Sequence, residues 1–384
     1  MTVEAKFKSH SVEVVNYLKH QIKLAGGKIT FAEYMQHALY AKDLGYYANN
    51  ISNKFGVNGD FITAPMLGQL FANCIINQFS NLKFSQILNQ SFNILELGAG
   101  NGRLAYQLVG LIRNLNNNFF KNNFNNYLIL ETSKELIKQQ KQFLLASDLN
   151  LEDKNKFFWV DELPKNFNGI ILANEVLDAL PVNLFKIYNQ QIYEKFVTVN
   201  HNGDFEFVDI VASHDFSKKI KNLAINQYLY MDGFYSSEIC LLLPDFIKSL
   251  AVNLNKGAIF LCDYGFLAPE YYHPDRYLGT LMFHYKHFAH HDPFYLPGLQ
   301  DITAHVDFSV VIDTAISYDL NLEKFSSLAK FLMESNIQQA FIKEHKILST
   351  LNVKEQYKLN QEIYTLISPN EMGEIFKIAI FTKK

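Results

Sequence analysis

A glycine-rich run, GAGNG at residues 98–102, stands directly between a predicted strand and a predicted helix. Glycine has no Cβ, so such a run can turn sharply and lets a ligand approach the backbone closely. The helix that follows offers unpaired N–H groups and the positive end of its dipole, which suit a nucleotide or a carboxylate. Gly98, Gly100 and Gly102 therefore predict a nucleotide-type ligand, with a purely structural turn as the alternative.

Acidic residues beside this run narrow the choice of ligand. Glu96 lies two residues before Gly98, a position typical of the acidic residue that holds the methionine portion of S-adenosylmethionine in class I methyltransferases. Glu131 ends the second predicted strand, where a carboxylate can accept both hydrogen bonds from a ribose diol. Asp161 follows the third strand, where adenine is usually held. The dinucleotide pattern GxGxxG fails because its third glycine falls one position early, so S-adenosylmethionine is favoured over NAD.

Short apolar strands alternate with helices from residue 92 onward, which predicts a mostly parallel sheet with helices on both faces. Strands are expected at 92–97, 126–130, 156–160, 169–173, 258–262 and 376–381. Helices are expected at 101–112 and near 239–253, and a capping box at Thr132 and Glu135 predicts a further helix that begins there. The predicted class is α/β, with a class I Rossmann-like methyltransferase core.

The remaining segments are less regular. Residues 11–80 are expected to be helical with a turn-rich interruption at 55–65, and Thr30 with Glu33 has capping-box spacing. A hairpin is expected at 186–199 around Asn189 and Gln190. The predicted organisation is a helical N-terminal lid or substrate segment (1–90), a cofactor-binding core (91–264), an inserted covering segment without periodicity (265–310) and the C-terminal part of the core (311–384), with the Asn-rich run 114–126 as a surface loop.

Composition excludes several classes of protein. The 384 residues carry a net charge of −3 without a long block of either sign, which argues against a nucleic-acid partner. Three distant cysteines fit free thiols in a reducing compartment and neither a disulfide framework nor a zinc site. No apolar stretch is long enough to span a membrane, and the N-terminus lacks a secretory pattern. We therefore expect a cytoplasmic protein without membrane insertion.

Several longer strings resemble the MidA-like methyltransferase family. They are ITFAEYMQHALYAKDLGYY (29–47), GDFITAP (59–65), ELGAGNGRLA (96–105), ANEVLDALPVNLF (173–185), DYGF (263–266), PGLQDITAHVDF (297–308) and NEMGEIFKIAI (370–380). The resemblance implies a Rossmann-like core with extra helices covering the cofactor cleft, S-adenosyl-L-methionine as cofactor and protein arginine methylation as activity. In mitochondrial members it also implies a respiratory complex I core subunit as substrate and a location in the matrix. Met66 departs from the pattern, in which Glu is expected after TAP.

Candidate substrate residues follow the fourth predicted strand. A carboxylate pair can align a guanidinium group bidentately, and positioning is the main requirement of an in-line methyl transfer. Glu175 and Asp178 are therefore the predicted substrate contacts, with Asn174 nearer the cofactor. The alternative for Asp178 is a helix cap.

Further candidates lie on the covering segments. Asp60 and Thr63 could hold the cofactor or order a lid, and His305, near Asp301 and Asp307, could accept a proton after transfer or be a structural histidine. The spacing of four histidines is compatible with a metal site. No HExxH motif or cysteine partner accompanies them, so an aromatic loop without metal is expected. Those histidines are His284, His287, His290 and His291.

Two other functions stay open from the sequence. The same fold could methylate nitrogen or oxygen of a small molecule, since fold does not determine substrate. The chain could also be a non-catalytic binding or assembly factor that retains the cofactor site.

Overall fold

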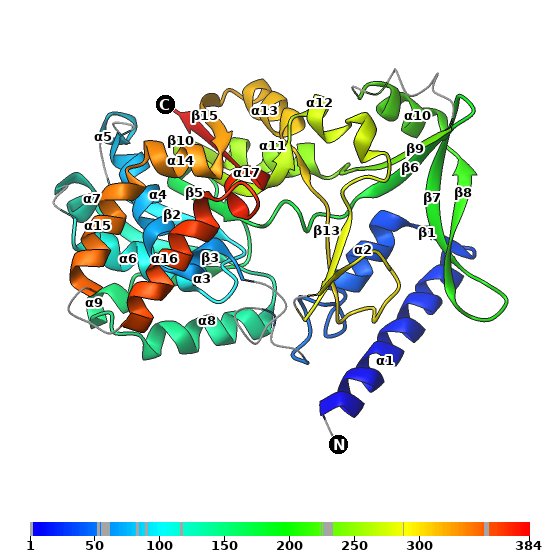
Figure 1. Ribbon diagram of the computed structural model, residues 1–384, viewed down its shortest axis with the longest axis horizontal. Coiled ribbons are helices and arrows are strands. Elements are labelled where there is room, and N and C mark those ends of the chain that lie inside the picture. The colour runs from blue at the N-terminus through cyan, green and yellow to red at the C-terminus, as the bar shows by residue number, and fades with distance from the viewer. Residues whose placement is uncertain are drawn as a thin grey trace. The chain divides into compact units, whose positions relative to one another are not determined.

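The computed structural model describes residues 3–51, 54, 62–81, 84–88, 91–115, 118–223, 225, 233–286, 288–348 and 353–384. The chain forms two compact units, each made of separate stretches (Figure 1). The first unit comprises Met1–Phe61, Leu177–Asp245 and Phe266–Val310, and the second comprises Ile62–Val176, Phe246–Gly265 and Val311–Lys384. This division differs from the four expected segments, because residues 62–90 belong to the second unit and residues 177–245 to the first.

The second unit is built on a sheet with the strand order β15-β16-β10-β5-β2-β3-β4. Its strands are β2 (Phe92–Leu97), β3 (Phe124–Leu130), β4 (Phe157–Val160), β5 (Phe167–Asn174), β10 (Leu254–Phe266), β15 (Asn321–Ser327) and β16 (Phe376–Lys383). Neighbours from β10 to β4 pair in parallel, whereas β16 pairs antiparallel with β10 and β15. The predicted mostly parallel α/β core is confirmed.

Helices cover this sheet on both faces. Ile94 and Ile170 pack into a core cluster with helices such as α4 and α6, and the alternate residues Leu95 and Ile171 are buried as well. In Figure 1 the C-terminal helices α15 and α16, orange to red, lie beside α3 and α4, in blue. The helices mostly or wholly in this unit are α3 (Ala64–Leu67), α4 (Leu70–Asn81), α5 (Phe84–Ile87), α6 (Arg103–Arg113), α7 (Asn118–Asn123), α8 (Lys134–Ala146), α9 (Leu151–Lys154), α11 (Leu243–Asn253), α13 (Phe308–Ser317), α14 (Leu328–Glu334), α15 (Ile337–Leu348), α16 (Val353–Ile367) and α17 (Met372–Ile375).

Two local predictions in this unit were wrong. The Asn-rich run 114–126 is not simply a surface loop, because α7 and the start of β3 lie in it and Phe120 is buried against Phe84 and Phe92. Helix α8 is capped by Ser133, whose side chain accepts a hydrogen bond from the Leu136 N–H, and not by the predicted Thr132.

The first unit contains an antiparallel sheet in the order β1-β7-β6-β9, and β8 also pairs antiparallel with β7. Its elements are α1 (Val3–Leu24), β1 (Lys28–Thr30), α2 (Phe31–Tyr40), β6 (Asn183–Tyr188), β7 (Gln191–Val199), β8 (Phe205–Val211), α10 (His214–Lys221) and β9 (Phe234–Ile239). The predicted hairpin is confirmed, and Asn189 (φ 47°) and Gln190 (φ 63°) form its tight turn. The capping box of α2 is also confirmed, since Thr30 and Glu33 bond each other reciprocally.

The segment 265–310, predicted to be without periodicity, contains several short elements of the first unit. They are α12 (Ala268–Tyr271), η2 (Pro274–Arg276), β11 (Met282–Tyr285), β12 (Phe288–His290) and β13 (Asp301–Thr303), followed by β14 (Val306–Asp307). β11 pairs with β12 and β13 in a small antiparallel sheet that buries Phe283 and Ile302. Elements of three or four residues are too short to leave a recognisable period in sequence.

The chain has three free thiols, and those of Cys74 and Cys262 are buried. Burial raises the pKa of Cys74 to about 12 and that of Cys240 to about 11. Within the described ranges, we find no helix of the length and apolarity that a bilayer crossing requires.

A buried carboxylate joins the C-terminal helices to the start of α4. Glu362 of α16 is 3% exposed, and its Oε1 accepts a hydrogen bond from the Leu70 N–H at 2.7 Å. A Cβ at Gly68 would overlap the Glu362 carboxylate, so any larger residue there would displace that side chain. Burial, with a smaller effect of Glu344, raises the pKa of Glu362 to about 7 against the opposing effect of the Leu70 hydrogen bond.

This raised pKa predicts a pH-dependent stability. The stabilising contribution of the protonated group is fully present below its ordinary pKa of 4.5 and is lost as the pH rises through about 7. We expect Glu362→Gln to exceed the wild type in free energy of unfolding by roughly 2–3 kcal/mol at pH 8 and to match it near pH 5. Denaturant titration at both pH values measures this, with Glu355→Gln on the same helix as control. An equal difference at both pH values would contradict the prediction.

Candidate active site

The glycine run forms a tight loop between β2 and α6. Gly98, Gly100 and Gly102 have φ values of 60°, 54° and 79°, a region that residues with a Cβ rarely adopt. The Gly98 N–H donates to the Leu130 carbonyl at 3.0 Å, which ties the loop to the end of β3. A Cβ at Gly98 would come within 3.2 Å of Val176 Cγ2, so the loop also passes close to the chain after β5.

Glu96 is buried in β2 just before this loop. It is 3% exposed, and its Oε2 accepts a hydrogen bond from the Tyr127 hydroxyl at 2.8 Å. Burial raises the pKa of Glu96 to about 7; the Tyr127 hydrogen bond opposes this shift, and the negative charge of Glu131 adds to it. Glu96 therefore changes charge near neutral pH, close to the loop.

Glu131 lies directly after β3 and is held from two sides. Its Oε1 accepts from the Ser133 N–H at 3.0 Å, and its Oε2 accepts from the Gln140 amide at 3.2 Å. Burial raises the pKa of Glu131, and these hydrogen bonds act in the opposite direction. The carboxylate thus has a determined orientation at the carboxyl end of its strand.

Trp159 of β4 and Gln140 of α8 were not predicted from the sequence as residues of this site. Asp161 follows β4 and is exposed, whereas Trp159 is partly buried and donates its indole N–H to Gln140 Oε1 at 2.8 Å. Lys141 Nζ lies 4.9 Å from the centre of the Trp159 ring. Gln140 could have been noticed, because it stands four residues from both Leu136 and Leu144 on the apolar face of its helix.

The turn after β5 is strained and held by β10. Glu175 has a φ of 55°, which costs about 1–3 kcal/mol for a residue with a side chain. Its N–H donates to the Cys262 carbonyl at 2.9 Å, and the Val176 N–H donates to Asp263 Oδ2 at 3.0 Å. Asp263 is 1% exposed and was missed as a site residue, although it stands in the DYGF string.

Asn174 is the last residue of β5, and only one of the two polar atoms of its side-chain amide has a hydrogen-bond partner among the described residues. Its Nδ2 donates to Glu175 Oε1 at 3.1 Å. Its Oδ1 is buried and accepts no hydrogen bond from the described part of the chain. Because a buried polar atom without a partner is costly, this oxygen is a candidate contact for a bound molecule.

Strand order explains why these residues share one edge of the sheet. The chain runs outward from β2 through β3 to β4 and then returns to β5 on the other side of β2. In parallel sheets, ligands bind beyond the carboxyl ends of the strands at such a reversal. The second unit therefore brings together the glycine loop, Glu96, Glu131, Asn174 and Glu175.

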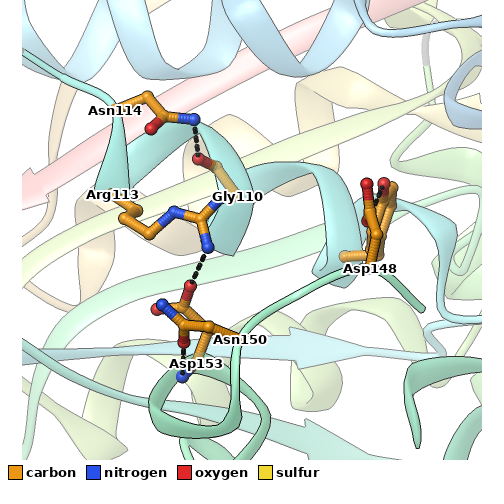
Figure 2. Close-up of polar contacts among 7 residues, drawn as sticks. Gly110, Arg113, Asn114, Asp148, Asn150 and Asp153 are labelled. Atoms are coloured by element: carbon orange, nitrogen blue, oxygen red, sulfur yellow. Dashed lines mark hydrogen bonds and ion pairs between the residues drawn. The ribbon is translucent and has the colours of Figure 1, made fainter. Parts of the chain in front are cut away.

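Helix α6, which follows the loop, is anchored at its far end (Figure 2). Arg113 Nη1 forms an ion pair with Asp153 Oδ2 at 2.9 Å, and the Asp153 N–H donates to Asn150 Oδ1. Nearer the N-terminus of the same helix, the Tyr106 hydroxyl donates to Asp148 Oδ1 at 2.7 Å. These contacts fix the helix whose N-terminus the glycine loop forms.

The other predicted site residues lie elsewhere. Asp178 and His305 belong to the first unit, so the structure does not gather them with Glu175 in one unit. Asp178 is buried in a turn where, among the described residues, no helix begins, which removes the helix-cap alternative. The His305 backbone N–H donates to Thr280 Oγ1 at 2.9 Å, and its ring lies 5.2 Å from that of Phe266.

Residues near the N-terminus of the second unit contribute little visible chemistry. Thr63 precedes α3 without a side-chain cap bond, and the Met66 N–H donates to the Thr63 carbonyl at 2.9 Å. Asp60 lies outside the described residues.

Neither the histidines nor the acidic cluster near His305 forms a metal centre in the described part of the chain, where no group of three suitable side chains could hold an ion. His284 and His290 lie on β11 and β12, and burial lowers the pKa of each. His287 is outside the described residues. Asp301 accepts from the Tyr47 hydroxyl at 2.9 Å, and Asp307 accepts from the Ser309 N–H.

Comparison with known proteins identifies the family. Residues 70–326 match the family model described as "Putative S-adenosyl-L-methionine-dependent methyltransferase". A Burkholderia thailandensis protein, crystallised with S-adenosyl-homocysteine, is 32% identical with a TM-score of 0.86, over 98% of this chain and 93% of that chain. The chain belongs to this methyltransferase family.

Curated relatives of the methyltransferase agree over nearly its whole length. Protein arginine methyltransferase NDUFAF7 of Danio rerio is 27% identical over 95% of this chain and 85% of its own length. The Caenorhabditis elegans homologue is 28% identical over 97% and 88%. The resemblance drawn from the dispersed sequence strings, the Rossmann-like fold and S-adenosylmethionine as cofactor are thereby confirmed.

The titration of Glu96 gives a prediction for cofactor binding. If the ionised carboxylate holds the ammonium of the methionine portion, affinity for S-adenosylhomocysteine increases as the pH rises through about 7. Tyr127→Phe removes the hydrogen bond that lowers the pKa of Glu96, so the midpoint of this profile should move upward. Calorimetric titration between pH 6 and 8 measures both effects, with Tyr106→Phe as control. A flat profile would contradict the role of Glu96.

Proposed function

We propose that this methyltransferase methylates arginine side chains of a partner protein. The observation that carries the proposal is the Asn174–Glu175 turn, which presents a carboxylate beyond β5 at the reversal of strand order. A guanidinium group is planar and always charged, and it pairs bidentately with a carboxylate. A carboxylate at this edge therefore suits an arginine acceptor.

Glu175 would act by alignment. Its backbone is held by Cys262 and, through Val176, by Asp263, while Asn174 contacts Oε1. Such support keeps a carboxylate in one orientation, which an in-line displacement requires of its acceptor. Bidentate pairing would also concentrate positive charge at the bound nitrogens and leave the outer nitrogen as the nucleophile.

The residues around the loop would hold the cofactor. Glu131 would accept hydrogen bonds from the ribose hydroxyls, Glu96 would pair with the ammonium group, and Asn174 Oδ1 would make a further polar contact. The glycine loop leaves room for the cofactor that a Cβ would occupy. When bound, S-adenosylmethionine supplies an electrophilic methyl group on a sulfonium sulfur.

The other predicted residues would add further contacts. Asp161 would contact adenine, and Thr63 and Asp60 would contribute from the segment before α3. Asp178 would be a second guanidinium contact and His305 a proton acceptor.

The names of the relatives support the acceptor class. The curated relatives across fish and nematodes are named protein arginine methyltransferases of mitochondria. Together with the MidA-like resemblance, this leads us to propose a respiratory complex I subunit as the acceptor. A cytoplasmic location stays a prediction for this chain.

Replacing Glu175 tests the proposal. We expect Glu175→Gln to lower the rate of methyl transfer by about 10²-fold, because a neutral amide cannot pair bidentately with guanidinium. Its affinity for S-adenosylhomocysteine should stay within about twofold of wild type. The assay follows labelled methyl transfer into proteins of a cell extract and identifies the labelled residue after hydrolysis.

Exposed Glu162 supplies the matched control, and Glu162→Gln should retain full activity. Label on arginine of one dominant protein supports the proposal. Label on small molecules would favour the small-molecule enzyme instead. Cofactor binding without any transfer would favour a non-catalytic assembly factor.

A further inference from the structure

We propose that Gln140 is a positioning residue for the cofactor, whose side-chain amide fixes the glycine loop and Glu131 together. The inference rests on the cofactor contacts proposed above. Gln140 lies on α8 and is not among the residues that the sequence predicts to contact the cofactor. Its side chain contacts the loop after β2, the residue after β3 and a residue of β4.

Its contacts use both ends of the amide. Nε2 donates to the Gly100 carbonyl at 2.9 Å and to Glu131 Oε2 at 3.2 Å. Oε1 accepts from the Trp159 indole N–H at 2.8 Å. These partners follow β2, follow β3 and lie in β4, so one side chain bridges the loop, the proposed ribose contact and the strand that leads to Asp161.

The chemistry of the partners determines how the amide must point. An indole N–H can only donate, and a carbonyl and a carboxylate can only accept. The amide oxygen must therefore face Trp159, and the two N–H groups must face Gly100 and Glu131. Glutamate would place a second carboxylate against Glu131, and methionine would supply neither a donor nor a useful acceptor.

Burial makes this arrangement more than a surface contact. Gln140 is 0% exposed, between Leu136 and Leu144 on the apolar face of α8. A buried polar side chain costs free energy unless its groups are paired, and here each end is bonded. A hydrophobic residue would satisfy packing alone, so the amide points to a role in orienting its partners.

The effect on Glu131 is specific. With Ser133 on Oε1 and Gln140 on Oε2, the plane of the carboxylate is determined, and its oxygens, each able to accept more than one hydrogen bond, can also accept from a diol. The hydrogen bond from Gln140 also opposes the effect of burial on the pKa of Glu131 and so favours the ionised acceptor. Loss of the amide should therefore weaken cofactor binding mainly through Glu131.

A double-mutant cycle tests this, with S-adenosylhomocysteine as the calorimetric probe. We expect Gln140→Met to weaken binding about tenfold, as the loss of one or two hydrogen bonds would. In the Glu131→Gln background the same change should cost at least about threefold less, because its main target is already altered. Gln139→Met, on the same helix where the Gln139 amide donates to Glu135 Oε1, is the matched control and should bind as wild type does.

Two results would overturn the inference: binding by Gln140→Met within twofold of wild type, or an equal loss with and without the Glu131 carboxylate. If Gln140→Met weakens binding equally in both backgrounds, Gln140 and Glu131 are not coupled. The loss would then come from a general structural defect. If Gln140→Met does not fold, Trp159→Phe takes its place in the cycle, with an expected loss of about threefold and the same two criteria. A failed ribose contact is recognised separately, as unchanged affinity in Glu131→Gln alone. None of these measurements depends on the identity of the acceptor.

Discussion

Backbone conformation at three glycines is the constraint on which the cofactor edge depends. Gly98, Gly100 and Gly102 all have positive φ, and only with such angles can β2 end and α6 begin within so few residues. Val176 lies so near that a Cβ at Gly98 would press against its side chain. The position of the glycine loop and the position of the Glu175 turn therefore depend on each other.

Around this loop the second unit buries carboxylates that most proteins leave in water. Glu96 and Glu131 are each supported by a hydrogen bond from another side chain, from Tyr127 and Gln140 respectively. Burial of charge is unfavourable without such partners, so these carboxylates cost stability that the surrounding apolar core must offset. Perturbed carboxylates gathered at one strand edge are typical of functional sites.

Much of this could be read from the sequence because it is local. The alternation of strands and helices, the glycine loop and the hairpin at Asn189 each depend on residues close together in the chain. Gln140 and Asp263 depend instead on the strand order, which brings α8 against the loop and β10 against the turn after β5. The covering segment and α7 were missed because their elements are short and are stabilised by packing of residues such as Phe120 and Phe283.

The most direct test is a crystal structure of this chain with S-adenosylhomocysteine. We expect the ribose hydroxyls to contact Glu131, the ammonium group to lie near Glu96 and the sulfur to point toward the Asn174–Glu175 turn. A ligand bound away from the carboxyl ends of β2, β3 and β5, or with its ribose turned from Glu131, would contradict it.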